Sequence, residues 1–425
     1  MSEMKDSGIE WIGATPETWK MIPLKYLASY NDEVLSENTD DEFEFDYIEI
    51  GSVQYGRGII YTEHMKFKNA PSRARRIVRK DDIIVSTVRT YLRAVATIPA
   101  CNNSLIASTG FIVIRPHKVL PRFMNYALLS ESFISLVESH STGISYPAIN
   151  SVDVVKFKIP VPCRSEQERI AAFLDAECAE IDAVLEKTRA SIEEYKKLKQ
   201  AIITQAVTKG IRGDRPMKDS GIEWIGDIPA EWSVVPFSKF ARVSANLVNP
   251  SDYQDYLQVS PENIEKDSGK LLSCKTVSEV GVESWNHFFH KGQILYSKIR
   301  PKLNKVCIAP FDGLCSADMY PIDTDNISKF VVYTILSNDF NQQVAMITEN
   351  RVKMPKINQK ELSKIIVVLP ADRMEQQEIV DYLDGECGKI DALIAKKQQY
   401  LTEIENYKKS LIYEYVTGKK EVLPL

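Results

Sequence analysis

Few residues in this 425-residue chain stand at a spacing that could support catalysis. His287 and His290 have the H-x-x-H spacing of a metal-binding pair, but no cysteine or carboxylate completes a set of zinc ligands beside them. We interpret both histidines as ordinary packing residues. Cys178 and Cys387 occupy equivalent places in two similar segments, and no histidine lies near either one in the sequence. We expect small core residues there rather than nucleophiles.

The motifs that hold phosphates, dinucleotides or a target adenine are missing from the sequence. It contains no G-x-x-x-x-G-K-S/T loop, no G-x-G-x-x-G turn after a strand, and no Asn- or Asp-Pro-Pro-aromatic tetrapeptide of adenine methyltransferases. The chain has five histidines, so there are few candidates for the residue type that most often acts as a general acid or base. We predict a non-catalytic protein without a cofactor or metal of its own. An active site assembled from distant residues, for example that of a nuclease, stays an alternative.

Positive charge gathers in residues 57–93, where ten lysines and arginines stand against three acids. Residues 31–49 are the reverse, with nine acids and no lysine or arginine. This pattern predicts one face that meets phosphate and another that faces solvent or a partner, whereas a merely solvated charged surface is the alternative. The cations that we expect at DNA are Arg57, Lys66, Lys68, Arg73, Arg75, Arg76, Arg89 and Arg93.

The sequence contains an internal repeat, whose two copies lie about 210 residues apart. Residues 5–13, KDSGIEWIG, recur without change as residues 218–226, and looser identities follow in register. A unit of this length is far longer than a solenoid repeat, so it indicates a duplicated two-part module that can mimic a symmetric dimer. Among the further matched pairs are Trp19 with Trp232, Arg89 with Arg300, Glu166 with Glu375, and Asp182 with Asp391.

The second copy has positive charge of its own at the corresponding place, in Lys298, Arg300, Lys302 and Lys305. Arg89 and Arg300 share one repeat position at the end of a predicted strand. A shared position favours a shared role, phosphate contact or structural pairing, over the reading of different bases. The interiors 31–80 and 244–290 have diverged, as expected of two readers with two targets on one scaffold.

In each copy of the repeat, a part rich in predicted strands is followed by a part that is predicted to be helical. Residues 1–162 and 214–370 mix short β-rich runs with turn residues. Residues 165–208 and 373–417 lack proline and are rich in Glu, Lys, Leu, Ile and Ala, which favours helix, with Ser165 as the expected N-cap of the first. Two glycines and a proline in residues 209–216 end that helix and turn the chain. We predict an α+β protein with two mixed domains, two long antiparallel helices and a pseudo-two-fold internal repeat.

Both helical segments carry a seven-residue hydrophobic repeat, which predicts a coiled coil. More than forty helical residues would span about 65 Å at 1.5 Å each, which is long for an ordinary core helix, the alternative interpretation. The seam residues are Leu174, Ile181, Thr188, Tyr195 and Ile202 in the first helix and Leu383, Ile390, Lys397, Ile404 and Leu411 in the second. The expected companion stripe consists of Val184, Leu198, Leu393 and Tyr400.

Composition limits the class of protein further. With 44% apolar and 26% charged residues the chain is typical of soluble globular proteins, and no run of about 18 apolar residues or N-terminal signal indicates a membrane partner or export. Seven cysteines without a C-x-x-C pair favour a reducing, cytoplasmic compartment. A net charge of −5 does not exclude DNA binding, because a binding face needs only local positive charge.

In this order and in duplicate, the motifs resemble the specificity subunits of type I restriction-modification systems. The resemblance covers nearly all of the chain. It rests on the repeated entry KDSGIEWIG…P…W, on SKIRP at 297–301, on TGISYP at 142–147, and on the helix start EQ…IA…FLD at 166–175. The second copy departs from it at 351–355, RVKMP, where the first has GISYP.

The resemblance implies a subunit that reads a split target in double-stranded DNA. Residues 1–162 and 214–370 would be the two target-recognition domains, and Ser145 and Tyr146 would join the DNA contacts. Residues 163–213 and 371–425 would be the spacer helices with link and tail, which set half-sites about one helical turn apart. Two methyltransferase subunits carrying S-adenosylmethionine would bind the chain and flip adenines, and motor-nuclease subunits using ATP and Mg²⁺ would join them. A pure assembly scaffold, whose basic window is only surface, stays an alternative.

Overall fold

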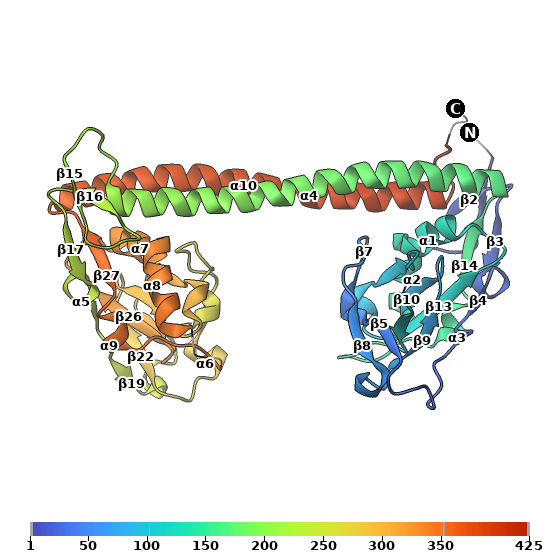
Figure 1. The fold of residues 1–425 in the computed structure, drawn as a ribbon, viewed down its shortest axis with the longest axis horizontal. Coiled ribbons are helices and arrows are strands. Elements are labelled where there is room, and N and C mark those ends of the chain that lie inside the picture. The colour runs from blue at the N-terminus through green and yellow to red at the C-terminus, as the bar shows by residue number, and fades with distance from the viewer. Residues whose placement is uncertain (1–2, 102, 350, 352, 423–425) are drawn as a thin grey trace. The chain divides into compact units, whose positions relative to one another are not determined.

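The computed structural model describes residues 3–101, 103–349, 351 and 353–422. The chain forms two compact units, and each is described by itself. Unit 1 consists of the residues up to Thr188 and those from Gln399 onward, and unit 2 of Arg189–Gln398. The two long helices, α4 (Arg164–Lys209) and α10 (Arg373–Val416), run from one unit into the other, so each unit holds a part of both (Figure 1).

Besides its parts of α4 and α10, the described residues of unit 1 form short strands and three short α-helices. Its helices are α1 (Pro121–Leu129), α2 (Glu131–Ser139) and α3 (Ser151–Val154). Its strands are β1 (Met4–Asp6), β2 (Ala14–Pro16), β3 (Lys20–Pro23), β4 (Ala28–Tyr30), β5 (Glu44–Ile48), β6 (Val53–Gln54), β7 (Gly58–Ile59), β8 (Glu63–Lys66), β9 (Ala74–Val78), β10 (Ile83–Ser86), β11 (Val95–Thr97), β12 (Leu105–Ser108), β13 (Phe111–Pro116) and β14 (Lys158–Val161).

Unit 2 has the same kind of make-up. Its helices are α5 (Phe237–Phe240), α6 (Val277–Val280), α7 (Ser328–Leu336), α8 (Asn338–Thr348) and α9 (Gln359–Leu362). Its strands are β15 (Met217–Asp219), β16 (Asp227–Pro229), β17 (Ser233–Pro236), β18 (Arg242–Val243), β19 (Leu247–Val248), β20 (Leu257–Val259), β21 (Lys275–Thr276), β22 (Asn286–Phe289), β23 (Ile294–Ser297), β24 (Val306–Ile308), β25 (Gly313–Cys315), β26 (Met319–Asp323) and β27 (Ile366–Leu369).

The sheets of the two units follow one plan. Unit 1 has the strand orders β11-β10-β13-β4 and β8-β5-β12-β9, and unit 2 has β24-β23-β26-β18 and β19-β22-β25-β20-β21. In the second sheet of each unit one central pair is parallel, β5 with β12 and β20 with β25. Four strands of the second sheet of unit 2, β21-β20-β25-β22, follow the order β8-β5-β12-β9 of unit 1, as the internal sequence repeat predicts, and β19 is an additional edge strand.

The central strands are apolar without alternation because they are covered on both faces. In β10, Ile83 and Val85 belong to one hydrophobic cluster and Ile84 to another. In β23, Ile294 and Leu295 are divided between two clusters in the same way. A strand buried on both sides reads as a continuous hydrophobic run, which is how the sequence presents these segments.

A buried tryptophan joins each globular part to the start of a long helix. Trp19 Nε1 donates a 3.1 Å hydrogen bond to Glu166 Oε2, and Trp232 Nε1 donates one of 3.0 Å to Glu375 Oε2. Both indoles are almost completely buried. The repeated tryptophan and glutamate are therefore explained by the fold.

The next repeated residues on the long helices also have partners within their own unit. A glutamine side chain on each helix accepts the backbone N–H at the start of a short helix, and an aspartate accepts a tyrosine hydroxyl. These pairs are Gln167 with Leu120 (2.8 Å), Gln376 with Ile327 (3.0 Å), Asp175 with Tyr126 (2.7 Å) and Asp384 with Tyr333 (2.7 Å).

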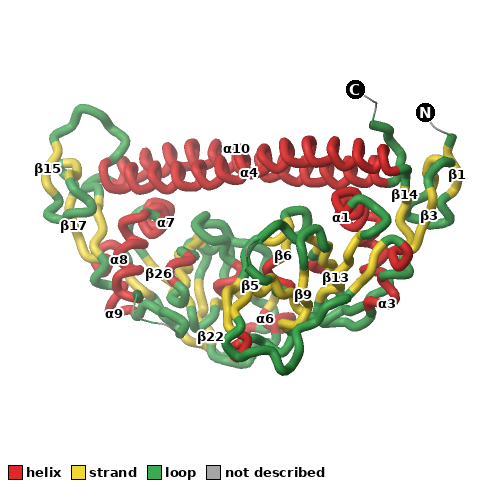
Figure 2. Tube along the Cα trace, turned by 45° about the vertical axis from the view of Figure 1, so that its right-hand side comes forward, coloured by secondary structure: helices red, strands yellow, loops and turns green. Residues whose placement is uncertain are grey.

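α4 and α10 lie side by side and run antiparallel, as Figures 1 and 2 show. In unit 1, the rings of Phe173 and Tyr415 lie 4.5 Å apart, and Lys408 bonds to Asp182 at 2.6 Å. In unit 2, Lys199 Nζ lies 2.7 Å from Asp391 Oδ1. As residue numbers rise along α4, those of the partners fall along α10. The predicted pair of long antiparallel helices is confirmed.

The seam residues lie on the covered side of this pair. Leu174, Ile181, Thr188, Leu383, Ile390 and Leu411 are buried, whereas Tyr195, Ile202, Lys397 and Ile404 are half-buried. Where the seam turns polar, Lys397 Nζ lies 5.6 Å from the centre of the Tyr195 ring, and the Thr188 hydroxyl bonds back to the Val184 carbonyl.

The expected companion stripe is wrong. Val184, Leu198, Leu393 and Tyr400 are each 39–48% exposed. Burial falls instead on the residues four positions after the seam, such as Cys178, Leu185 and Ile192 on α4. The residues three and four positions after a seam residue lie on opposite sides of the seam. The side on which the globular part packs is the side that becomes buried. The expected N-cap is also wrong, because α4 begins at Arg164 and Ser165 lies in its first turn.

Candidate nucleic-acid interface

A tightly held turn follows strand β10 in unit 1. Arg89 and Arg93 flank a 3₁₀ turn, Thr90–Leu92, and both have left-handed backbone, with φ of 55° and 53°. Such a backbone costs an L-residue about 1–2 kcal/mol, so it persists only where surrounding contacts fix it.

The neighbouring loop supplies one set of these contacts. Arg89 N donates to Pro147 O at 2.8 Å, and Thr90 Oγ1 donates to Ser141 Oγ at 2.8 Å. Val88 forms a β-bridge with Ala148 beside them. The TGISYP loop is therefore bonded onto the turn.

Arg93 supplies the other anchor of the turn. Its guanidinium bonds to Glu138 at 2.9 Å and to Glu131 at 2.7 Å, both on α2. The hydrogen bond that Arg93 donates to Glu138, and after it the one that it donates to Glu131, hold the pKa of Arg93 above its usual value. Arg93 was among the residues expected at DNA, and in unit 1 these two carboxylates of α2 pair with its charge. Its glutamates lie 38 and 45 residues away, and no local pattern in the sequence marks them.

Arg89, in contrast, points its charge outward. Its guanidinium carbon lies 5.0 Å from the centre of the Tyr146 ring, and in the described part of the chain no carboxylate pairs with it. Tyr146 is 63% exposed, and Ser145 beside it is exposed as well. An exposed arginine that is stacked on an aromatic ring keeps its hydrogen-bond donors free for a phosphate or a base edge.

Unit 2 repeats the turn at the same repeat position. Arg300 and Asn304 are left-handed, with φ of 44° and 45°, and flank the 3₁₀ turn Pro301–Leu303. Arg300 N donates to Pro355 O at 2.7 Å, as Arg89 does to Pro147. The buried Asn304, whose Nδ2 donates to Leu336 O at 3.3 Å, stands where unit 1 has Arg93.

The loops over the two turns share their ends and differ inside. Among the described residues of these loops, Gly143 has a positive φ of 108° in unit 1, and Met354 has a positive φ of 48° in unit 2. Met354 stands where unit 1 has Tyr146. At this repeat position the loops over Arg89 and Arg300 therefore differ in both backbone and side chain.

The remaining cations of unit 2 are divided by their surroundings. Arg300 and Lys302 are exposed. Lys298 Nζ lies 5.2 Å from the centre of the Tyr320 ring, and Lys305 Nζ bonds to Pro261 O at 2.6 Å. Only the first two have the exposure that a phosphate contact needs.

The expectation that acids 31–49 and bases 57–93 form opposite faces is wrong. β5 and β8 pair antiparallel and set the two segments against each other. Glu42 accepts both Lys66 at 2.7 Å and Lys68 at 2.5 Å, and these two lysines lower the pKa of Glu42. Outside this pairing, Arg57 is bonded to Glu186 at 2.6 Å. Much of the positive window is neutralised within unit 1.

Arg79 of the window pairs with Glu33 at 2.7 Å, and the arginines that are still to be placed are Arg73, Arg75 and Arg76. Arg73 is exposed, and Arg75 lies 4.9 Å from the centre of the Phe67 ring. Arg76 is half-buried, with no hydrogen-bond partner for Nε among the described residues, and burial lowers the pKa of Arg76.

Of the residues considered for catalysis, His287, Cys178 and Cys387 are buried, whereas His290 is exposed, so the expectation that both histidines are packing residues is wrong for His290. His287 is buried on β22, and burial lowers the pKa of its imidazole. Cys178 and Cys387 are buried, and burial raises the pKa of both thiols, that of Cys387 to about 11. Across the described ranges, no group of three or more His, Cys, Asp and Glu could hold a metal ion, and no helix is long and apolar enough to cross a membrane.

Two copies of one sheet-and-helix module, each presenting an arginine on a braced turn, define a duplicated recognition protein. A family model described as the type I restriction modification DNA specificity domain matches residues 16–194 and 239–406. This chain belongs to that family. Its role is DNA sequence specificity in a type I restriction-modification system, and it is not the catalytic component.

Individual relatives agree with this assignment. The specificity subunit of the type I restriction enzyme EcoDI of Escherichia coli is 33% identical over 326 residues, 72% of each chain. The MjaVIII specificity subunit of Methanocaldococcus jannaschii is 24% identical and covers 96% of this chain and 94% of its own. A chain in a solved structure of a type I restriction-modification system has a TM-score of 0.71 at 20% identity, covers 96% of this chain and 99% of its own, and shares the fold.

Proposed function

We propose that each unit reads one half of a split target in double-stranded DNA. The target-recognition domains would be residues 1–162 and 214–370, and residues 163–213 and 371–425, which contain α4 and α10, would be the spacer segments. Methyltransferase subunits that bind S-adenosylmethionine, and motor-nuclease subunits that use ATP and Mg²⁺, would act on the DNA that this chain selects.

One observation carries the proposal: Arg89 and Arg300 stand exposed on the same strained, doubly braced turn in two otherwise diverged units. A residue kept in both copies suits the common element of every target, which is the phosphate backbone. Strain that is maintained by surrounding contacts is typical of ligand-binding positions.

The side chains next to these arginines differ, as sequence readers should. Tyr146 and Ser145 flank Arg89, whereas Met354 stands in the place of Tyr146 in unit 2. We assign phosphate contact to Arg89, Arg300 and Lys302, and half-site selection to the loops around them. Arg73 and Arg75 are further candidates for unit 1, whereas the paired Lys66 and Lys68 are weaker ones.

The test is the salt dependence of DNA binding by the assembled complex. Each lost phosphate contact lowers the slope of log K against log[salt] by about 0.9. The double variant Arg89→Ala, Arg300→Ala should reduce the slope by about 2 on a duplex of random sequence, because phosphate contacts do not depend on sequence. Lys66→Ala, whose lysine is already paired with Glu42, is the control. An unchanged slope in the double variant would remove both arginines from the interface.

A further inference from the structure

Large apolar side chains stand exposed around the Arg89 turn of unit 1. Ile144 is 102% exposed, so this residue is as accessible to solvent as in an extended peptide. Tyr146 is 63%, Tyr91 55% and Leu92 37% exposed. Single exposed apolar residues are normal at a protein surface, whereas several at one place mark a binding surface. Together these four residues form the apolar rim of the turn.

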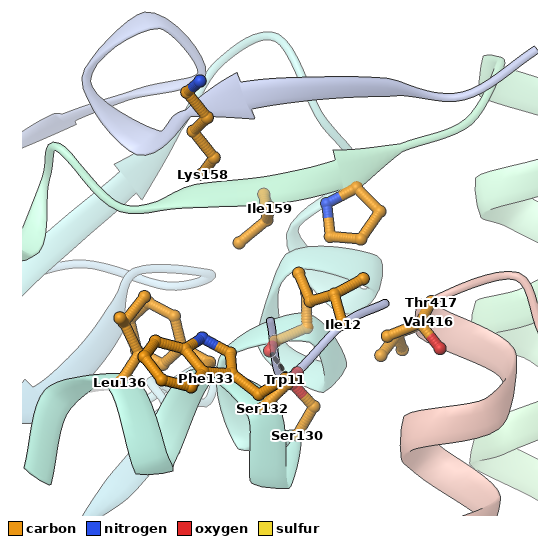
Figure 3. Close-up of a pocket in the computed structure, with 12 residues that line it drawn as sticks. Trp11, Ile12, Ser130, Ser132, Phe133, Leu136, Lys158, Ile159, Val416 and Thr417 are labelled. Carbon is orange, nitrogen blue, oxygen red and sulfur yellow. Dashed lines mark hydrogen bonds between the residues drawn. The ribbon is translucent and has the colours of Figure 1, made fainter. Parts of the chain in front are cut away.

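Packing does not account for this rim, although it does account for another exposed aromatic residue of unit 1. Trp11 is 37% exposed, but it lines a small cavity together with Ile12, Phe133 and Val416 (Figure 3). One side of that indole therefore belongs to the interior of unit 1. Ile144 has no such cover, because the whole residue is exposed.

The loop that carries Ile144 is held in one shape. Thr142 and Ala148 close it by exchanging two backbone hydrogen bonds, each of 2.9 Å. At Gly143, φ is 108° and an added Cβ would lie 3.2 Å from the Tyr146 carbonyl oxygen, so this position favours glycine. An isoleucine that a braced loop presents in this way loses little conformational freedom when it binds.

The charge of this surface favours DNA as the occupant. Residues 87–93 and 141–150 contain two arginines and no aspartate or glutamate. Arg89 is exposed, and no carboxylate in the described part of the chain pairs with it, so it attracts phosphate. An aliphatic side chain cannot bind phosphate. It can contact the one apolar group on a base edge, the 5-methyl group of thymine, which lies in the major groove.

Unit 2 presents different chemistry at the same repeat positions. Lys302 stands in the place of Tyr91, and Lys353 stands in the place of Ser145. Both lysines are exposed. Unit 2 thus adds positive charge where unit 1 is uncharged, around an arginine that the two units share. Loops that differ in this way suit different bases, since cations bind the acceptors of guanine and apolar groups bind the thymine methyl.

We infer that Ile144 reads a thymine in the half-site of unit 1, by van der Waals contact with its 5-methyl group in the major groove. The rest of the apolar rim excludes water around this contact, and Arg89 holds the loop on a neighbouring phosphate. The inference rests on the proposed function, because it takes unit 1 to lie on duplex DNA.

The experiment measures the binding of a target duplex by the assembled complex of this chain with its methyltransferase subunits. The half-site of unit 1 is the one that changes when residues 1–162 are exchanged for those of a relative. Each thymine of that half-site, on either strand, is replaced in turn by deoxyuridine, which lacks only the 5-methyl group. Loss of one buried methyl group should raise Kd about 4-fold at one of these positions. With Ile144→Ala, thymine and deoxyuridine at that position bind equally well.

Two further measurements separate this contact from a general effect on the protein. Ile144→Ala weakens target binding but leaves the slope of log K against log[salt] unchanged, because no phosphate contact is lost. The matched control is Ile60→Ala in the same unit. Ile60 is 50% exposed beside Tyr61, whose hydroxyl bonds to Glu49 at 2.8 Å, a setting that phosphate avoids. This control keeps the parent affinity and the full response to deoxyuridine.

Equal binding of thymine and deoxyuridine by the parent complex at every position of the half-site overturns the inference. An Ile144→Ala complex that still distinguishes them overturns it as well. Both results leave the proposed function standing if the complex prefers its target to a duplex of random sequence, whereas a complex without that preference overturns both. An Ile144→Ala chain that binds DNA like the parent but loses a subunit assigns the apolar rim to protein and contradicts the inference.

Discussion

Asp391 Oδ1 lies 2.7 Å from Lys199 Nζ, and this ion pair links α10 to α4 within unit 2. The lysine side chain is only 13% exposed. Lys270, from the globular part, lies 3.3 Å from the other carboxylate oxygen. Asp182 and Lys408 make the counterpart of this pair in unit 1. One carboxylate thus ties both long helices and the globular part of unit 2 together.

The Asp391 pair should make unit 2 sensitive to acid. Burial alone would raise the pKa of Asp391, but hydrogen bonding and charge from Lys199 and Lys270 outweigh it and lower that pKa. A lowered folded-state pKa stabilises above the usual aspartate range and loses its effect as pH falls through the folded value. Asp391→Asn should lower the free energy of unfolding by about 1–2 kcal/mol at pH 7.

Urea unfolding between pH 7 and pH 3 would check this prediction. The difference between parent and variant should shrink below pH ~4, where the carboxylate becomes protonated. The exposed Asp325, changed to Asn, should have no effect on the same curve. A difference that persisted unchanged at pH 3 would mean that the ion pair is not its source.

Two glutamates at one repeat position should differ greatly in their contribution to stability. Glu375 is buried and bonds to Arg215, itself only 9% exposed, besides Trp232. Glu166 is half-buried and bonds to Trp19. Glu375→Ala removes the buried partner of Arg215, which then keeps the exposed Glu231 as its ion-pair partner, and should cost about 2–3 kcal/mol, against about 1 kcal/mol for Glu166→Ala. Guanidinium unfolding measures both, and equal losses would contradict the role given to Arg215.

The buried stripe of the helix pair predicts that the same substitution has different effects on stability at Ile181 and at Val184. Ile181 is 9% exposed and Val184 is 39% exposed. Ile181→Asp should lower the free energy of unfolding by about 3 kcal/mol because it buries an unpaired carboxylate, whereas Val184→Asp should change it by less than about 0.5 kcal/mol. Lys397→Leu should raise stability. Thermal melting decides the matter, and comparable losses from the two aspartate variants would mean that the buried stripe is misassigned.

Substitution of the two arginines of the unit 1 turn should have different effects, one on thermal stability and the other on DNA binding. Arg93→Ala removes the bonds to Glu131 and Glu138 and should lower the melting temperature. Arg89→Ala removes a solvent-facing charge and should leave melting unchanged while weakening binding of the complex to duplex DNA. Melting and fluorescence anisotropy on the same preparations test both. If Arg93→Ala leaves stability intact, that residue is not an anchor.

Periodicity and repetition predict the large features of this fold. The heptads of 165–208 and 373–417 predict α4 and α10 to within one residue, because a long helix depends on local sequence. The short β-rich runs that the sequence predicts within residues 1–162 and 214–370 include the central strands β10 and β23. The division of the strands between two sheets in each unit is not predicted, because strand order is set by contacts between distant residues.

The charged residues show why the site is harder to predict. Lys66 and Glu42 are 24 residues apart and look like opposite poles in the sequence, yet pairing of β5 with β8 brings them to 2.7 Å. Arg89 and Arg93 look alike in the same window, but one is exposed and the other is held by α2. Net charge in a window carries no information about the register of strands, which decides whether a cation is free.

The central claim, that this chain selects a split DNA target, is tested most directly by the methylome of cells that carry it with its partner subunits. The account predicts one bipartite methylated motif that disappears when the chain is deleted. Exchange of residues 214–370 for those of a relative should then alter one half of the motif and leave the other half unchanged. A methylome that is the same with and without the chain would contradict the account.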